Sequence, residues 1–148
     1  MILLITVGTT SFKELVTYCT TNKDFISICK SKFNKITIQH GETKVVAPFA
    51  NCFSYVSDLQ PFINEADVII THGGAGTLLE CLKADKRVIA VTNPKLQDNH
   101  QVELVEKWAS RNYLIHCKSV TTLTTEITSK KRLTKRPKVN NKIELPFY

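Results

Sequence analysis

Residues 67–80 read Asp67-Val-Ile-Ile-Thr71-His72-Gly73-Gly74-Ala75-Gly76-Thr77-Leu-Leu-Glu80. The β-branched apolar run at 68–70 is typical of a buried strand. Three glycines follow within four residues, and the composition of 78–84 favours a helix. Strand, glycine turn and helix start form a phosphate-binding geometry, because glycines let the backbone approach a ligand and the first N–H groups of a helix point at an anion. We predict that this stretch binds the diphosphate of a nucleotide.

Apolar runs alternate with amphipathic stretches along the rest of the chain. Ser11 is a candidate cap for the first helix, and Ser57 or Asp58 for a later one with Pro61 in its first turn. The alternation predicts the α/β class, with a single doubly wound, Rossmann-like, mostly parallel sheet. We predict strands at 2–7, 35–39, 45–49, 52–56, 68–70, 87–92 and 113–116, and helices at 12–33 in one or two parts, 59–65, 78–84, 102–110 and 120–128.

Small polar residues follow three of the predicted strands. They form the loops Gly8-Thr9-Thr10, 72–77 and 93–101. Ligands of open α/β sheets bind outside the carboxyl ends of the strands, so these loops should meet at one edge and line a binding cleft.

Composition and length favour one soluble globular domain of 148 residues, with 43% apolar and 22% charged residues. No apolar run approaches the roughly 20 residues of a membrane span. The cysteines are odd in number and never spaced as C-x-x-C, which favours reduced, mostly buried thiols in a cytosolic protein over zinc or disulfide frameworks. They are Cys19, Cys29, Cys52, Cys81 and Cys117.

The net charge of +7 is concentrated near the end of the chain. Residues 118–148 hold eight Lys or Arg against two Glu, a net +6, which leaves +1 for 1–117. We predict an α/β domain over 1–129 and a basic C-terminal tail over 130–148, with 130–142 mobile. No aromatic residue lies among the basic ones at 130–136, so we expect no nucleic-acid partner. A tail that is solvated or lies near an anionic leaflet is the simpler interpretation.

Two common nucleotide motifs do not fit the glycines. No lysine follows Gly76 as a P-loop requires, and Leu79 stands where the third glycine or alanine of a dinucleotide fingerprint belongs. The glycines could instead form a tight turn whose only role is close packing of the helix. The spacing of Thr77 and Glu80 after the glycines argues against this alternative.

The spacing His72-x-Gly74-x-x-Thr77-x-x-Glu80 resembles the donor signature of GT-B glycosyltransferases, which have two facing doubly wound domains. The resemblance implies that the glycine turn takes a diphosphate and that the glutamate holds the ribose hydroxyls. A later Asp/Asn-Gln pair reads the sugar hydroxyls in those enzymes, and Asn99-His100-Gln101 stands where that pair is expected. Residues 1–129 would then be the nucleotide-sugar donor-binding half of such an enzyme.

A narrower resemblance rests on three runs: Val7-Gly8-Thr9-Thr10-x-Phe12, 72–77, and Asn93-x-x-Leu96-x-Asp98-Asn99-His100-Gln101-x-Glu103-Leu104. They are similar to the small cytosolic catalytic subunits of two-chain UDP-GlcNAc transferases, whose domain is like the C-terminal domain of glycosyltransferase family 28. The resemblance implies addition of the second GlcNAc to dolichol-diphosphate-GlcNAc in N-glycosylation. It also implies a heterodimer with a membrane-anchored acceptor-binding subunit, and a cytoplasmic protein recruited to the cytosolic face of the endoplasmic reticulum. A chain of this length is expected to supply one of the two GT-B domains.

The resemblance assigns a role to each candidate residue. Backbone N–H groups near Gly74 to Thr77 and the Thr77 hydroxyl bind the diphosphate, Glu80 binds the ribose, and Asn99 and Gln101 bind the sugar. Residues 8–10 flank the phosphates or the acceptor. The predicted donor-binding residues are Gly8, Thr9, Thr10, His72, Gly73, Gly74, Ala75, Gly76, Thr77, Glu80, Asn99 and Gln101.

Several alternatives remain open at this point. His72 touches the phosphate or only caps its strand, and it is the one candidate catalytic residue, since no general base is assigned. The alternative for Glu80 is a solvated glutamate in the first turn of a helix, and the alternative for Asn99 and Gln101 is a polar helix start. The sequence has no Asp-x-Asp motif, so we expect no cofactor and metal-independent transfer, with UDP-GlcNAc as substrate. A non-catalytic regulatory or scaffold subunit that binds UDP or a nucleotide sugar is the alternative function.

Overall fold

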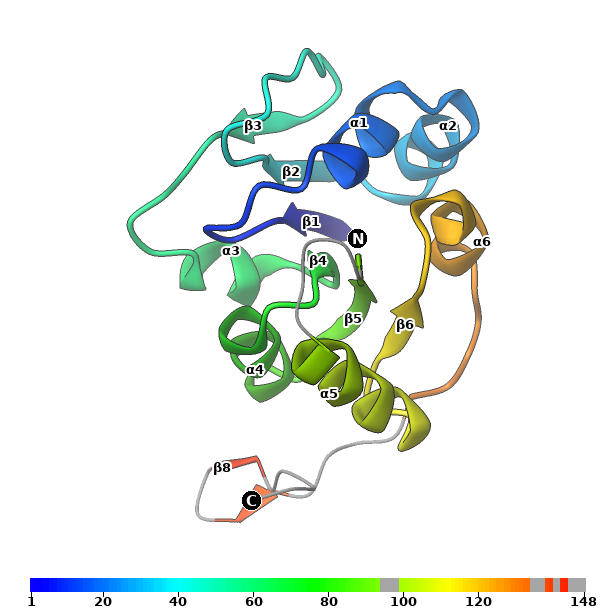
Figure 1. The fold of residues 1–148 in the computed structure, drawn as a ribbon. Helices are drawn as coiled ribbons and strands as arrows, with labels where there is room; N and C mark the ends of the chain where they lie inside the picture. Colours follow the sequence, from blue (N-terminus) through cyan, green and yellow to red (C-terminus); the bar gives the residue numbers. More distant parts are fainter. Residues whose placement is uncertain (94–98, 134–137, 140–141, 144–148) are drawn as a thin grey trace.

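Six parallel strands form one twisted sheet at the centre of the protein (Figure 1). The computed structural model describes residues 1–93, 99–133, 138–139 and 142–143. The strand order is β3-β2-β1-β4-β5-β6, and every neighbouring pair is parallel. This confirms the predicted α/β, doubly wound, Rossmann-like sheet. The strands are β1 (Ile2–Thr6), β2 (Lys35–Gln39), β3 (Asn51–Phe53), β4 (Val68–His72), β5 (Arg87–Val91) and β6 (Ile115–Cys117).

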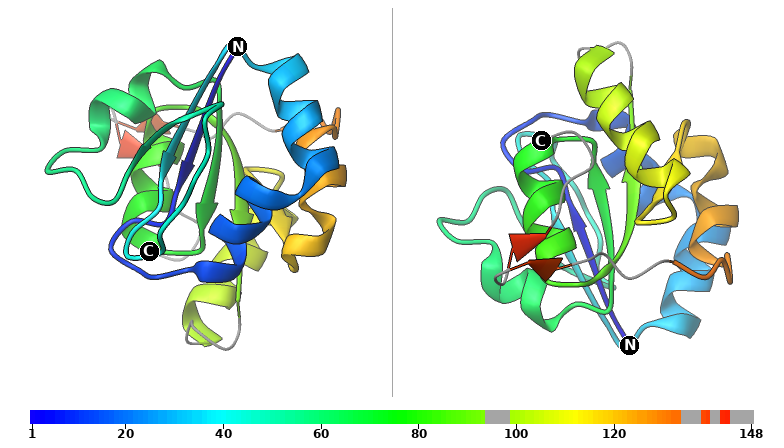
Figure 2. Two further views of the ribbon diagram at one scale, coloured as in Figure 1. Left: turned by 90° about the horizontal axis from the view of Figure 1, so that it is seen from above. Right: turned by 90° about the horizontal axis from the view of Figure 1, so that it is seen from below.

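Helices cover both faces of this sheet (Figure 2). One face packs against the first two helices and α6, and the other packs against α3, α4 and α5. The helices are α1 (Lys13–Thr21), α2 (Lys23–Lys32), α3 (Gln60–Glu65), α4 (Ala75–Lys83), α5 (Asn99–Ser110) and α6 (Leu123–Ile127), with a 3₁₀ turn, η1 (Val120–Thr122), before α6. None of the helices that the structure describes is long and apolar enough to cross a bilayer.

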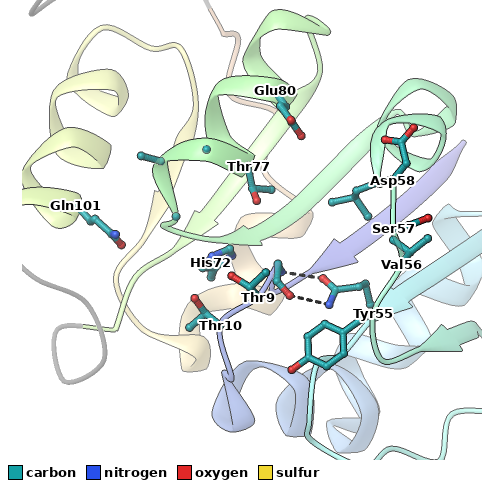
Figure 3. A pocket seen from close by; sticks show the side chains of 16 residues that line it. Thr9, Thr10, Tyr55, Val56, Ser57, Asp58, His72, Thr77, Glu80 and Gln101 are labelled. Atoms are coloured by element: carbon teal, nitrogen blue, oxygen red, sulfur yellow. Dashed lines mark hydrogen bonds between the residues drawn. The ribbon is translucent and has the colours of Figure 1, made fainter.

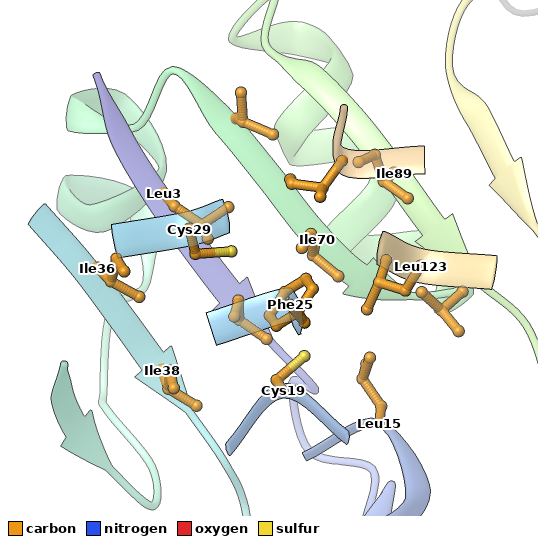
Figure 4. Close-up of a cluster of buried hydrophobic side chains, with 14 of the residues drawn as sticks. Leu3, Leu15, Cys19, Phe25, Cys29, Ile36, Ile38, Ile70, Ile89 and Leu123 are labelled. Atoms are coloured by element: carbon orange, nitrogen blue, oxygen red, sulfur yellow. The ribbon is translucent and has the colours of Figure 1, made fainter. Parts of the chain in front are cut away.

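Burial on both faces explains why the strand sequences are continuously apolar. Along β1, Leu3 and Ile5 face the α1–α2 layer, while Leu4 faces α3 and α4. In the first layer Phe25 and Cys29 of α2 lie over the sheet (Figure 4).

The cysteines are part of this packing. All five are free, and all but Cys52 are buried. Burial raises the pKa of the Cys29 and Cys81 thiols to about 12, so both are neutral apolar groups at physiological pH. The predicted burial of most of the thiols is thus confirmed.

Several predicted boundaries differ from the structure. No strand forms at 45–49, because Pro48 sits inside a turn that the Ala50 amide closes by donating to the Ala47 carbonyl at 3.1 Å. The strand predicted at 52–56 is shorter and ends at Phe53. Ser11 does not cap α1, which begins after Phe12 without a side-chain cap.

Two helices begin three residues earlier than predicted. α4 begins at Ala75 instead of residue 78, and α5 begins at Asn99 instead of residue 102. Gly76 therefore lies inside a helix. The polar run 99–101, predicted as the end of a loop, forms the first turn of α5; the rest of that loop, 94–98, lies outside the described residues.

The basic tail contains a small antiparallel pair, β7 (Lys138–Val139) with β8 (Lys142–Ile143), and β8 lies close to α4. The guanidinium of Arg87 donates to the carbonyls of Ser129 and Lys131, which ties the chain after α6 to the start of β5. Residues 134–137, 140–141 and 144–148 lie outside the described residues. The boundary at 129 and the mobility of 130–142 stay predictions.

The strand order places the crevice of the sheet. From β1 the chain runs outward to β2 and β3, then returns to β4 on the other side of β1 and continues to β5 and β6. The point where this order reverses, between β1 and β4, is where ligands bind in open α/β sheets. The turn at 8–10 follows β1, and the glycine run follows β4. Both therefore lie at the same edge of the sheet, as predicted.

Candidate nucleotide-binding site

A cavity of about 470 Å³ lies at this reversal point, at the carboxyl edge of the sheet (Figure 3). Its walls come from the turn after β1, the end of β2, the segment after β3, the end of β4 with the start of α4, and the start of α5. The residues that line it are Gly8, Thr9, Thr10, Gln39, Tyr55, Val56, Ser57, Asp58, Leu59, His72, Gly74, Ala75, Gly76, Thr77, Glu80 and Gln101.

The cavity gathers ten of the twelve residues predicted to bind the donor. Gly73 is buried behind the lining and does not contribute to it. Asn99 begins α5, and its side chain lies outside what the structure describes. The geometry therefore assembles the predicted site, while the role of each residue in binding stays a prediction.

The turn after β1 forms one wall. The Thr10 amide donates to the Val7 carbonyl at 3.2 Å and closes a four-residue turn. Gly8 has a φ of +61°, a left-handed conformation that a side chain would strain. This glycine is therefore required by the turn, independently of any ligand.

His72 is the last residue of β4 and fills the gap between two glycines. Its side chain is nearly buried, and its Nδ1 lies 3.3 Å from the Thr71 hydroxyl. A Cβ added to Gly74 would lie 2.3 Å from His72 Nε2, and one added to Gly8 would lie 2.9 Å from Cε1. The imidazole thus sets the spacing between the turn after β1 and the start of α4.

Burial lowers the pKa of His72, and a hydrogen bond with the Thr6 backbone opposes that shift. The ring is therefore neutral at physiological pH. A neutral imidazole can donate a hydrogen bond to a phosphate or accept one from a hydroxyl, but it brings no positive charge to the cavity.

The start of α4 is the strongest anion-binding feature of the cavity. Gly74 is the N-cap residue and makes no side-chain cap, and the first turn carries no acidic residue. The first N–H groups of a helix lack intrahelical partners and carry the positive end of the helix dipole. Ala75 and Gly76 are exposed here, so these groups face the cavity with little side chain in the way.

The charged side chains of the described lining are both acidic. Glu80 is exposed one turn along α4, and Asp58 lies across the cavity, where its carboxylate accepts from the Gln60 amide at 3.0 Å at the start of α3. No lysine or arginine occurs among the described lining residues. Anion binding in this part of the cavity therefore depends on backbone N–H groups and hydroxyls.

Two parts of the lining were missed from the sequence. Segment 55–59 follows β3 and includes the exposed side chains of Tyr55 and Val56. The rule that placed the other loops would have found it, had the strand been predicted to end at Phe53. Gln39 was assigned to a strand, and nothing in its spacing indicated a polar contact at the sheet edge.

The described residues hold no cluster of three or more His, Cys, Asp or Glu side chains placed to bind a metal ion. Together, the reversal-point cavity, the glycine-rich helix start and the parallel sheet define an α/β domain with a candidate nucleotide-binding crevice. The chain belongs to glycosyltransferase family 28: the model of the family's C-terminal domain matches residues 2–145.

Individual relatives agree with this family. A mouse (Mus musculus) protein named UDP-N-acetylglucosamine transferase subunit ALG13 is 37% identical over 121 residues, which are 76% of this chain and 10% of the mouse protein. This chain thus spans about a tenth of that relative's length.

Solved structures support the fold. The NMR structure of ALG13 has a TM-score of 0.67 at 19% identity and covers 90% of this chain and 87% of its own. MurG of Acinetobacter baumannii has the same TM-score and identity, over 86% of this chain and 40% of MurG. The predicted likeness to one half of a GT-B glycosyltransferase is confirmed at the level of fold.

Gly74→Ala should destabilise the protein by about 1–3 kcal/mol, because the new methyl group meets the buried His72 ring. Gly76→Ala is the matched control. A Cβ there meets nothing within 4 Å, and replacing a helical glycine should raise stability by up to about 1 kcal/mol. Urea unfolding measures both. In a His72→Ala background the cost of Gly74→Ala should largely vanish. If Gly74→Ala lowers the unfolding free energy equally with and without the His72 ring, the predicted contact between the two residues is wrong.

The unfolding free energy should decrease as pH falls below 6.5, the ordinary pKa of histidine. The unfolded chain takes up a proton there that the buried His72 resists, so protonation favours unfolding. Burial also lowers the pKa of His116, whose Nε2 bonds to Thr92 Oγ1, so it acts in the same direction. Urea unfolding between about pH 7.5 and pH 5 should show a smaller slope for His72→Gln and His116→Gln than for the parent chain. Unchanged slopes would show that neither histidine carries the effect.

Proposed function

We propose that the cavity binds UDP-GlcNAc and that this domain is the donor-binding catalytic subunit of a UDP-GlcNAc transferase. The transferase would add the second GlcNAc to GlcNAc-diphosphate-dolichol. The observation that carries the proposal is the cavity itself, where the free start of α4, Glu80 one turn later and Gln101 of α5 share one lining. The family membership supports a glycosyltransferase, and the name of the mouse relative supports UDP-GlcNAc as the donor.

In this proposal the diphosphate sits at the start of α4. Bond breakage between the sugar and UDP leaves negative charge on the diphosphate. N–H groups at 75–77 and the Thr77 hydroxyl are already aimed at that charge, so they stabilise the leaving group without reorganisation. The described lining offers no basic side chain for this task, which makes the helix start its main electrostatic component.

The nucleoside and the sugar of the donor then occupy opposite sides of the cavity. Figure 3 shows Glu80 and Gln101 on opposite sides of Thr77. With the phosphates at the helix start, the nucleoside lies on the Glu80 side, where the carboxylate accepts from the ribose hydroxyls and segment 55–59 faces the base. The GlcNAc hydroxyls lie on the Gln101 side, near the start of α5, where Asn99 is also placed in the chain.

The acceptor hydroxyl needs a general base. His72 is the candidate in this chain, and its neutral ring has the right protonation state, but its burial leaves little of it open to an acceptor. We therefore propose that the acceptor, and a base if His72 is not one, come from a membrane-anchored partner chain. The word subunit in the relative's name supports such a heterodimer. The complex would work at the cytosolic face of the endoplasmic reticulum, without a cofactor or a metal.

The same burial of His72 favours a second candidate function, a non-catalytic subunit that binds UDP or a nucleotide sugar and regulates or scaffolds another enzyme. Both functions predict UDP binding. They differ in whether any sugar is transferred.

Co-expression with membrane-anchored candidate partners should yield a complex that transfers GlcNAc from UDP-GlcNAc to a lipid-diphosphate-GlcNAc acceptor. Transfer is followed with radiolabelled donor, with each chain alone as a control. EDTA should leave the rate unchanged. UDP binding without transfer by any partner would favour the regulatory subunit, and loss of activity in EDTA that Mg²⁺ restores would refute metal-independent transfer.

Glu80→Ala should weaken UDP binding by about ten-fold, because the ribose loses a charged hydrogen-bond acceptor. Calorimetric titration with UDP measures the change. Glu65→Ala is the matched control: that glutamate pairs with Lys35 at 2.8 Å, at the start of β2 and away from the cavity. Its affinity should equal that of the parent chain. Equal UDP affinities for the parent chain, Glu80→Ala and Glu65→Ala would show that Glu80 does not bind the ribose.

A further inference from the structure

Gln39 ends β2 with its side-chain amide turned toward the cavity and only 2% of the residue exposed. Its Oε1 accepts from the backbone amides of Gly8 at 2.8 Å and Val7 at 3.1 Å, and from the Thr6 hydroxyl. Its Nε2 donates to the carbonyls of Gly8 at 2.9 Å and Ser54 at 2.8 Å. Both ends of the amide are therefore fully engaged.

These bonds hold Gly8 from both sides, because one amide group binds its N–H and its carbonyl. Gly8 is also the residue with φ +61° that lies against His72 and Thr77. A left-handed residue at the tip of a turn is otherwise free to flip its flanking peptides. Gln39 fixes them in the orientation that the cavity needs.

The bond to Ser54 connects this wall to a second one. Ser54 directly precedes segment 55–59, and its carbonyl also accepts from the Gly41 amide at 3.0 Å. The Gln39 amide thus bridges the turn after β1 and the segment after β3, which lie on two sides of the cavity (Figure 3).

We propose that Gln39 is a positioning residue of the donor site: it sets the separation between the Gly8 turn, beside the phosphates, and segment 55–59, beside the nucleoside. It does not touch the reacting atoms. The inference rests on the proposed function for the identity of the ligand, but the bridge is a property of the unliganded protein.

Gln39→Met and Gln39→Glu distinguish the effect of the amide hydrogen bonds from the effect of side-chain volume. Methionine keeps the length of the side chain and removes all the hydrogen bonds. A carboxylate keeps the acceptor for Val7 and Gly8 but has no N–H for the Gly8 and Ser54 carbonyls, which it would face with like charge. Ile36→Ala, on the same strand but in the opposite, apolar layer, serves as a control that destabilises the fold without touching the cavity.

UDP titration and amide hydrogen exchange test the proposal at a temperature where every variant is folded. Gln39→Met and Gln39→Glu should each raise the Kd for UDP about ten-fold or more, and Ile36→Ala should stay within about two-fold of the parent chain. Without ligand, the Gly8 amide should exchange faster in Gln39→Met and keep its protection in Ile36→Ala.

The outcomes are distinguishable. Unchanged Gly8 exchange, or UDP affinities no weaker than that of Ile36→Ala, would overturn the positioning role. If the parent chain does not bind UDP while Gly8 exchange still accelerates in Gln39→Met, the proposed function fails and the structural bridge stands. A purely structural glutamine would lower the unfolding temperature of both variants and leave the affinity of the folded protein unchanged.

Discussion

The pairing of β1 with β4 is the constraint on which the rest of the molecule depends. Leu3 to Thr6 lie in parallel register with Val68 to Thr71, although more than sixty residues separate them in the chain. This pairing reverses the strand order and aligns the ends of the two strands. The turn after β1 and the glycine run after β4 therefore meet, with His72 between them, and the cavity follows from their meeting.

In the described part of the cavity, the negative and the positive potential come from different parts of the protein. Its charged side chains, Glu80 and Asp58, are both acidic, and the positive potential comes from the start of α4. Backbone dipoles are fixed by the fold, so they need no conformational change to meet an anion. In the proposed function the Glu80 carboxylate accepts hydrogen bonds from ribose hydroxyl groups, and the neutral His72 adds no positive charge to the cavity. The residue types in the lining thus suit a ligand with one anionic centre flanked by sugars.

The sequence predicted the fold and most of the site because the strong signals are local. The apolar run before His72, the glycines after it and the alternation of strands with helices each depend on neighbouring residues. One failure occurred where distant contacts decide. Gln39 gains its role from Gly8 and Ser54, which only the folded sheet brings together. The start of α5 was missed for a different reason, since the polar run before Val102, although it has the composition of a helix start, was assigned to the loop. The strand predicted at 45–49 failed for a local reason, because Pro48 lies in a turn that interrupts the run.

The walls of the cavity come from five segments that span the chain from Gly8 to Gln101. No single segment carries the whole site, because the central strand β1 comes first in the chain and its partners follow at residues 35 and 68. Closing such long loops is slow compared with forming the helices. During synthesis the complete cavity can therefore form only after the chain as far as Gln101 is available. Any nucleotide held there would stabilise the completed fold alone and would raise its population at the expense of partly folded forms.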